Sequence, residues 1–163
     1  EQDHTDYYAL EMMNQVLSGG SSSRINKSIV EKKEMAAFAF SFNYALEDAG
    51  LGIFAAIANK DVLLDDIQAE FDAQIKLIRN ELISEKEFQK IRNSIENDII
   101  SSNSSIAGIA ENLANNHVYF GGAELINGEL ENYLSVTRED IMRVSKTYLV
   151  QSNSVTLYYL PKK

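Results

Sequence analysis

The chain has 163 residues, of which 45% are hydrophobic and 24% charged, and its 24 acidic and 15 basic side chains give a formal net charge of −9. This length suits one domain with one sizeable core, and the composition is that of a globular protein and excludes wholesale disorder. The acidic balance and the lack of a large basic cluster argue against a nucleic-acid or anionic-membrane surface, because phosphate contacts need concentrated Lys and Arg.

Apolar spacing predicts a helix near the start of the chain, with Asp3, Thr5 or Asp6 as its cap, and Gly19–Gly20 would end it. The serines at 21–23 then offer caps for a short second helix. The expected inward side chains of these two helices are Leu10, Met13, Leu17, Ile25 and Ile29.

The clearest strand is expected at 37–46, where bulky and small side chains alternate, so that each kind shares one face. The small-residue face would allow a helix or an extended peptide to approach the sheet closely. A turn at 47–50 and a second strand at about 51–59 follow, and the two strands should pair as a hairpin. Phe54 is expected on one face of the second strand, and Ile53 and Ile57 on the other. The bulky face of the first strand consists of Phe38, Phe40, Phe42, Tyr44 and Leu46.

Helical periodicity dominates the second half of the chain. An apolar stripe at 64–82 predicts a long amphipathic helix. Ser84 and Glu87 have the spacing of a capping box, which would begin another helix, and the polar run at 101–105 would end it.

Shorter elements are expected towards the end of the chain. The next helix should end before Gly121–Gly122, and a short helix at 125–134 should be interrupted near Gly128. The residues 137–140 have the pattern of a cap for the last helix, and Val155–Leu160 is expected to form a final strand.

The order of these elements predicts an α+β fold, with an antiparallel or mixed sheet and helices packed mainly on one face. Residues 1–163 contain no linker, low-complexity tract or internal repeat, so we expect a single domain. No apolar run approaches the roughly 20 residues that span a bilayer, so membrane insertion is not expected.

The residue types that carry enzyme chemistry are sparse. The chain has no cysteine, which excludes a disulfide framework, a thiolate zinc site and a cysteine nucleophile. His4 and His117 are too far apart for a His-x-x-Glu-His or His-Glu-x-x-His zinc helix, and we interpret His117 as a partly buried, hydrogen-bonded histidine at a helix end. No serine lies in a Gly-x-Ser-x-Gly elbow. We therefore expect neither catalytic residues nor metal ligands on this chain.

The glycine- and serine-rich loop at 19–23 precedes a helix and is followed by Arg24. Helix N-termini that follow glycine attract anions, but the spacing here matches neither a dinucleotide fingerprint nor a P-loop. A structural ion pair of Arg24 at a turn between two helices is the favoured interpretation.

Three segments, in order over almost the whole chain, resemble the zinc metallopeptidases of the pitrilysin/insulinase family, which includes the mitochondrial processing peptidases. Each segment alone is moderately specific, and their order and spacing make the resemblance strong. The segments are Asp6–Ile25 with its Gly-Gly-Ser-Ser-Ser-Arg-Ile end, Glu31–Gly50 with the aromatic strand, and Val136–Pro161 with its Val-Thr-Leu-Tyr-Tyr-Leu-Pro end.

This resemblance implies a lobe that works with a partner. In that family, homologous α+β lobes enclose a peptide-binding chamber, and one lobe carries zinc on a His-x-x-Glu-His motif that this chain lacks. The chain resembles the non-catalytic lobe, so the resemblance implies zinc on a homologous partner lobe, in the same polypeptide or a separate subunit, and a peptide substrate held partly by strand addition. It also implies that the lobe normally begins with a further strand, so residues 1–163 are expected to be an excised lobe without that strand. Ser22, Ser23 and Arg24 are the candidate contacts to substrate or partner lobe.

One departure from the family pattern leaves an alternative open. Active members place an Arg and a Tyr seven residues apart in this lobe, and Val30 and Ala37 stand at those positions here. Neither side chain can donate a hydrogen bond or stabilise developing charge. The alternative is therefore a pseudo-peptidase lobe that acts as a scaffold or assembly subunit without turnover. An unrelated acidic α+β binding domain is the remaining alternative.

Overall fold

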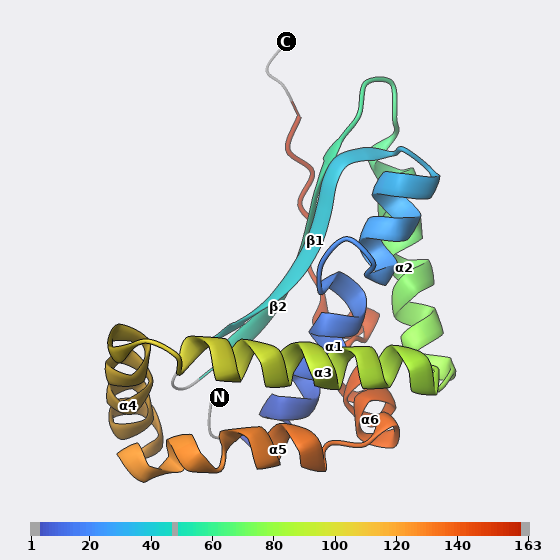
Figure 1. The fold of residues 1–163 in the computed structure, drawn as a ribbon. Helices are drawn as coiled ribbons and strands as arrows, with labels where there is room; N and C mark the ends of the chain where they lie inside the picture. Colours follow the sequence, from blue (N-terminus) through green and yellow to red (C-terminus); the bar gives the residue numbers. More distant parts are fainter. Residues whose placement is uncertain (1–3, 47–48, 161–163) are drawn as a thin grey trace.

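The computed structural model describes residues 4–46 and 49–160 of the chain. Figure 1 shows two layers, in which a strand hairpin stands on one side and the helices lie on the other side and beneath it. The expected α+β fold, with an antiparallel sheet and helices packed mainly on one face, is confirmed.

The sheet is a hairpin of β1 (Ala36–Ala45) and β2 (Gly50–Ala58), which pair antiparallel. The register sets Phe40 opposite Ala55, so the bulky side chains of β1 share a face with the isoleucines of β2. The predicted hairpin is confirmed, and so is the alternation from Phe38 onward. The prediction is wrong at Ala37, because an irregularity in the register between Ala36 and Phe38 buries Ala36 and leaves Ala37 exposed. Residues 47–48 of the predicted turn lie outside the described residues.

Helix α1 (Tyr7–Ser18) packs on the small-residue face of β1. The Ser41 N–H donates to Ser18 Oγ at 2.9 Å, and the Ser41 hydroxyl donates to Asn14 Oδ1 at 2.7 Å. Asn43 Nδ2 donates to Glu11 Oε1 at 2.9 Å. The occupant of the small-residue face is therefore a helix of the same chain.

The short second helix is η1 (Asn26–Lys32), which is wound as a π-helix. Ile25 and Ile29 are fully buried, as expected. The next helix, α2 (Leu64–Asn80), packs against β2.

Glu70 of α2 fixes η1 to α2. Its carboxylate accepts hydrogen bonds from Ser28 and Lys33 on the η1 side and from Gln74 of α2. Burial alone would raise the pKa of Glu70, but these donors outweigh burial and hold its pKa below the usual value.

The start of α3 (Glu85–Ser102) forms half of the predicted capping box. Ser84 Oγ accepts from the backbone N–H of Glu87 at 3.2 Å. The carboxylate of Glu87 does not reach back to the cap, because it forms an ion pair with Arg24.

The predicted breaks after α3 are confirmed. Helix α4 (Ile106–Phe120) ends at Gly121, whose φ of +82° is a left-handed conformation that favours glycine. A 3-10 helix, η2 (Ala123–Asn127), is separated from α5 (Glu129–Ser135) by Gly128.

The last α-helix is α6 (Arg138–Tyr148), and it begins with a complete capping box. Asp140 N–H donates to Thr137 Oγ1 at 3.1 Å, and Thr137 N–H donates to Asp140 Oδ2 at 3.1 Å. The short 3-10 helix η3 (Gln151–Asn153) follows.

The expected final strand, Val155–Leu160, is wrong for the described part of the chain. These residues are extended and exposed, but they pair with neither described strand. The Tyr158 hydroxyl instead lies against α2, 2.7 Å from Asp65 Oδ1 and within hydrogen-bonding distance of Gln68 Oε1. The segment is therefore held to α2 by the side chain of Tyr158 and not by backbone pairing with a described strand.

The core lies between the inner face of the hairpin and the helices. No helix in the described residues has both the length and the apolar composition of a membrane span. The core side chains are Ala9, Met12, Met13, Val16, Leu17, Ile25, Ile29, Ala36, Ala39, Ile67, Ile78, Ile83, Phe88, Ile91, Ile95, Val136, Ile141 and Val144.

Candidate functional site

The loop between α1 and η1 carries the three predicted contact residues, and an ion pair fixes one of them, Arg24. Arg24 donates twice to Glu87 of α3, from Nε to Oε1 at 2.9 Å and from Nη2 to Oε2 at 2.7 Å. A bidentate, half-buried pair of this kind is both directional and charge-assisted. The structural ion pair expected for Arg24 is present, and the identity of its partner on α3 was not foreseen.

The two serines before Arg24 differ in exposure. Ser22 is exposed and accepts a hydrogen bond from Lys90 of α3. Ser23 is buried, and its hydroxyl has no partner among the described residues. Ser22 is thus the member of the trio whose side chain faces outward, and the role of the three residues as contacts stays a prediction.

The resemblance described above assigns Val30 and Ala37 to the positions of an Arg and a Tyr. Val30 is half-buried and packs against the core, whereas Ala37 is exposed at the start of β1. Both side chains are hydrocarbon, so neither of these two positions supplies a side-chain donor for a developing negative charge.

The histidines do not form a metal centre with their neighbours. His4 is exposed, and its Nδ1 accepts the backbone N–H of Asp6 at 3.0 Å. His117 is exposed on α4, so the expectation of a partly buried histidine is wrong, because α4 covers η2 with another of its faces. Within residues 4–46 and 49–160, no three His, Cys, Asp or Glu side chains gather as a metal site, and the donors present do not fit zinc.

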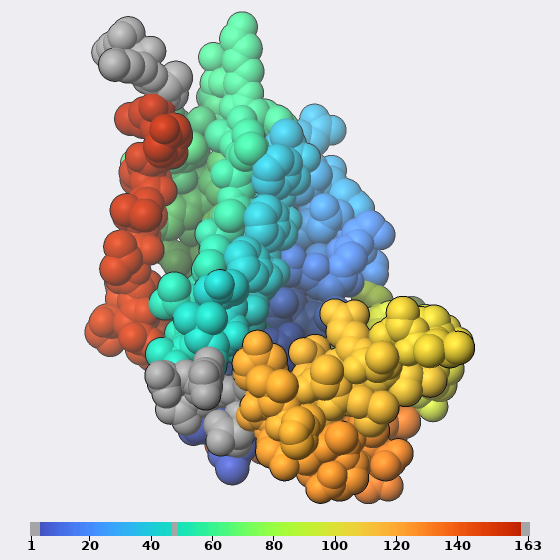
Figure 2. Space-filling view, turned by 90° about the vertical axis from the view of Figure 1, so that its left-hand side faces the viewer, coloured from blue at the N-terminus to red at the C-terminus, as the bar shows by residue number. Residues whose placement is uncertain are grey.

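The outward side of the hairpin is apolar and open, and we call it the aromatic face. The side chains of Phe38, Phe40 and Phe42 are 37% to 46% exposed. Their rings stack in a row, with centroids 5.8 and 6.0 Å apart and interplanar angles of 26° and 21°. Figure 2 shows the strands open to the viewer, with no described helix across them. The aromatic face consists of Phe38, Phe40, Phe42, Tyr44, Leu51, Ile53 and Ile57.

A groove runs beside β2, on the side away from β1. In Figure 2, residues 154–160 (red) form a column that is separated from β2 by a gap, with α2 lying deeper between them. Phe71 of α2 contacts Phe54 of β2 edge-on at 5.7 Å, and Gln68 of α2 contacts Tyr158. Residues 155–160 make no backbone hydrogen bond within the described chain. Helix α2 therefore forms the floor of a groove with a strand edge on one side and an extended segment on the other.

A cluster of tyrosines joins α1 to α5. Tyr8 meets Tyr7 and Tyr133 edge-on, with centroid distances of 5.3 and 4.8 Å. Burial raises the pKa of Tyr7 to about 12, and burial also raises the pKa of Tyr133 above its usual value. The pKa values of Glu11 and Glu129 are raised by burial too. All of these shifts follow from the burial of the groups where α1 packs on α5.

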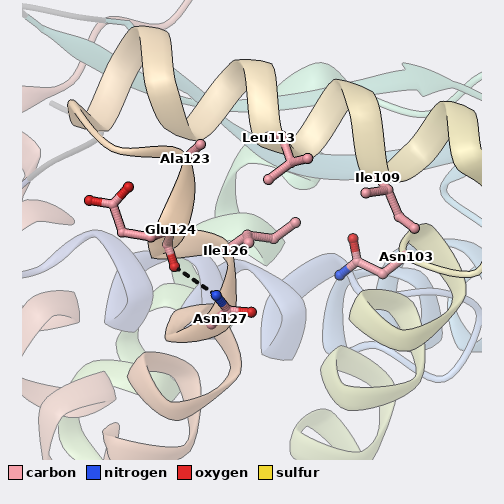
Figure 3. Close-up of a pocket in the computed structure, with 7 residues that line it drawn as sticks. All are labelled: Asn103, Ile109, Leu113, Ala123, Glu124, Ile126 and Asn127. Atoms are coloured by element: carbon pink, nitrogen blue, oxygen red, sulfur yellow. Dashed lines mark hydrogen bonds between the residues drawn. The ribbon is translucent and has the colours of Figure 1, made fainter.

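A hollow of about 470 Å³ lies between α4 and η2. Figure 3 shows Ile109 and Leu113 pointing into it from α4 and Ile126 from η2. The Asn127 side chain at its edge donates to the backbone oxygen of Glu124 at 3.2 Å. The lining contains no pair of titratable groups that could act together on a substrate.

Comparison with a family of known domains gives a match over more than half of the chain. A family model described as the peptidase M16 inactive domain matches residues 1–95. These residues include α1, the 19–24 loop, the hairpin, α2 and the first half of α3.

Individual relatives give the same result. Zinc protease PqqE from Helicobacter pylori is 28% identical, and the alignment covers 97% of this chain but only 35% of that protein. The crystal structure of a protease from Helicobacter pylori has a TM-score of 0.86 at 26% identity, covering 93% of this chain and 36% of that chain. The inactive peptidase domain from Bordetella parapertussis shares the fold, with a TM-score of 0.86 at 19% identity and coverage of 99% and 87%. The chain thus spans about a third of its full-length relatives and most of the separate domain.

Proposed function

The chain belongs to the family of peptidase M16 inactive domains, and from that membership we propose that it is the non-catalytic lobe of a zinc metallopeptidase. In this role it helps a zinc-bearing partner lobe to enclose and bind a peptide. Membership in the family sets aside the alternative of an unrelated acidic α+β binding domain.

The proposed partner is a homologous lobe that holds zinc, which supplies the chemistry of peptide-bond hydrolysis when it is bound there. Two observations support this arrangement. The chain spans 35% of the length of its zinc-protease relative, which leaves room for a second lobe in such proteins. The described side chains of this chain do not offer a ligand set that fits zinc. The partner lobe is either part of the same polypeptide or a separate subunit.

The aromatic face is the single observation that carries the proposed role. Among the described residues, the helices that pack on the hairpin (α1, η1 and α2) lie on its inner side, and the other side is an apolar wall. A monomeric soluble protein rarely exposes a large contiguous apolar patch without a binding role. A wall of this kind suits a lobe that closes over a peptide and excludes water from it.

Among the three predicted contact residues, Ser22 is the best placed for a role at the surface of the lobe. It is exposed, whereas Ser23 is buried and Arg24 is held by Glu87. We propose that Ser22 contacts the substrate or partner lobe and that Ser23 and Arg24 fix the loop that presents it.

We also propose that a further strand of the same lobe fills the groove beside β2. The groove has an unpaired strand edge on one side and an extended segment without backbone partners on the other. An open strand edge presents unpaired N–H and C=O groups with which a further strand can pair. Producing the chain with the roughly ten preceding residues of its parent is expected to raise its midpoint of thermal unfolding by several degrees. An unchanged midpoint would argue against this proposal. A matched extension with scrambled sequence is the control.

The role as a substrate-enclosing lobe is tested in the full-length parent. Deletion of this lobe is expected to lower peptide turnover at least tenfold, because the peptide loses part of its enclosure, while the zinc content stays near one per chain. Adding the separate lobe back should restore part of the turnover. Zinc is measured by elemental mass spectrometry on the parent, on the deletion variant and on this chain alone. Equal turnover with and without the lobe would overturn the proposal.

Val30 and Ala37 favour a second candidate function, a pseudo-peptidase lobe that serves as a scaffold. Their hydrocarbon side chains remove the donors that active members place at these positions. The same measurements separate the two candidates. The parent is measured alone and mixed with any separate homologous subunit. Absence of zinc and of turnover from both samples would support the scaffold and contradict the peptidase lobe.

A further inference from the structure

We propose that the aromatic face is a binding site for an extended peptide segment whose contacting side chains are apolar and which carries no acidic side chain on that side. This inference rests on the proposed function and names the class of peptide that the lobe selects. It is carried by the spacing of the rings, by the lack of charged residues at 36–46 and 49–59, and by the net charge of the chain.

The ring spacing matches an extended chain. The centroids of Phe38, Phe40 and Phe42 are 5.8 and 6.0 Å apart. Same-side side chains of an extended peptide repeat every two residues, which is about 6.6 Å. A peptide that lies along β1 can therefore set successive same-side side chains against successive rings. A helical ligand would present its side chains at other intervals.

The chemistry of the aromatic face favours apolar side chains. Residues 36–46 and 49–59 contain no Asp, Glu, Lys, Arg or His, although the chain as a whole has 39 Asp, Glu, Lys and Arg side chains. A charged peptide side chain on these rings would lose water without gaining a partner of opposite charge, which is unfavourable. Apolar side chains gain contact with rings that are already partly desolvated by stacking on each other.

The net charge of the chain disfavours acidic peptides. The exposed Glu34 and Asp61 lie just beyond one end of the hairpin. Lys32, Lys33 and Lys60 occur at the same end, so acidic and basic side chains are both present there. The net charge of −9 adds a general repulsion of acidic ligands. Lysines flanking the apolar segment of a peptide are therefore tolerated, and glutamates are not.

The test is equilibrium binding of fluorescent decapeptides to the full-length parent protein after zinc removal by a chelator, so that no peptide is cleaved. The probes alternate leucine with threonine between terminal lysines, and a matched set has glutamate in place of two leucines. The leucine peptide is expected to bind at least tenfold more tightly than the glutamate peptide. Equal affinities would overturn the proposal.

Variants locate the binding. Phe40→Thr removes the middle ring from a strand position that accepts threonine, and it is expected to weaken the leucine peptide about tenfold. Phe40→Tyr keeps the stack and should change the affinity by less than about twofold. Val118→Thr, an exposed position on α4, is the matched control and should leave the affinity unchanged. Midpoints of thermal unfolding within a few degrees of the wild type confirm that the variants fold.

The outcomes separate this inference from the proposed function. Turnover of peptides by the zinc-loaded parent, with no effect of Phe40→Thr on affinity or on KM, would overturn the peptide site and leave the lobe's role intact. Binding that depends on Phe40 in a parent without zinc or turnover would support the site and contradict the peptidase lobe. A self-association that Phe40→Thr abolishes, with peptide affinity unaltered, would assign the face to a second copy and overturn the proposal.

Discussion

Asp6→Ala is expected to lower the free energy of unfolding by about 3 kcal/mol at pH 7. The carboxylate of Asp6 accepts from Arg143 Nη2 at 2.7 Å and from the Tyr148 hydroxyl at 2.9 Å. These contacts join the residue before α1 to α6, so they fix the first helix to the last one. Urea unfolding of the wild type and the variant measures the loss. Glu96→Ala, which removes an exposed carboxylate from α3, is the control and should stay within about 0.5 kcal/mol.

The contribution of Asp6 should depend on pH in a defined direction. The hydrogen bond from Arg143 outweighs burial and, with the Tyr148 hydroxyl, holds the pKa of Asp6 below its usual value. A carboxyl whose pKa is lower in the folded state stabilises the fold above its unfolded pKa of about 3.9, and this stabilisation disappears as the pH falls through the lowered pKa. The difference between the wild type and Asp6→Asn should therefore persist from pH 7 to about pH 4 and shrink below that. A difference that does not change with pH would show that the charge of Asp6 contributes nothing.

Leu17→Ala is expected to cost about 3 to 4 kcal/mol of unfolding free energy. Leu17 lies on α1 and is fully buried, so its removal leaves a cavity that the tightly packed small-residue face of β1 cannot fill. Leu10→Ala on the same helix is the matched comparison, because Leu10 is only partly buried and should lose about 1 kcal/mol. Denaturant titration of both variants gives the ratio of their losses in unfolding free energy. Equal losses would mean that the two leucines are packed equally, contrary to the described core.

Much of the local structure could be predicted because it depends on short-range patterns. The alternation in β1 from Phe38 onward and the breaks at Gly121 and Gly128 are set by neighbours within a few residues, and the structure confirms them. The prediction of a final strand at 155–160 was wrong because a strand needs a partner as well as the right composition. The segment is exposed along its length, and it pairs with neither described strand.

The candidate site was predictable only in part, for a similar reason. The aromatic residues could be assigned to one face of β1 from their spacing alone. Which face stays open depends on where α1 and α2 pack, and that is a property of the whole fold. The partner of Arg24 also could not be read from the sequence, because Glu87 lies 63 residues away and had an equally plausible local role in a capping box.

The sparse packing of α4 has a consequence for how the molecule opens. No residue of this helix is buried in the described structure, and its packing is mainly against η2. The free energy of opening such an element is far below that of the global transition, because little apolar surface is exposed when it detaches. Amide protons of α4 should therefore exchange with solvent through local opening of the helix, whereas those of α1 should exchange only when the whole domain unfolds. The corner formed by α4 and η2 can change its shape without disturbing the wall that the hairpin provides.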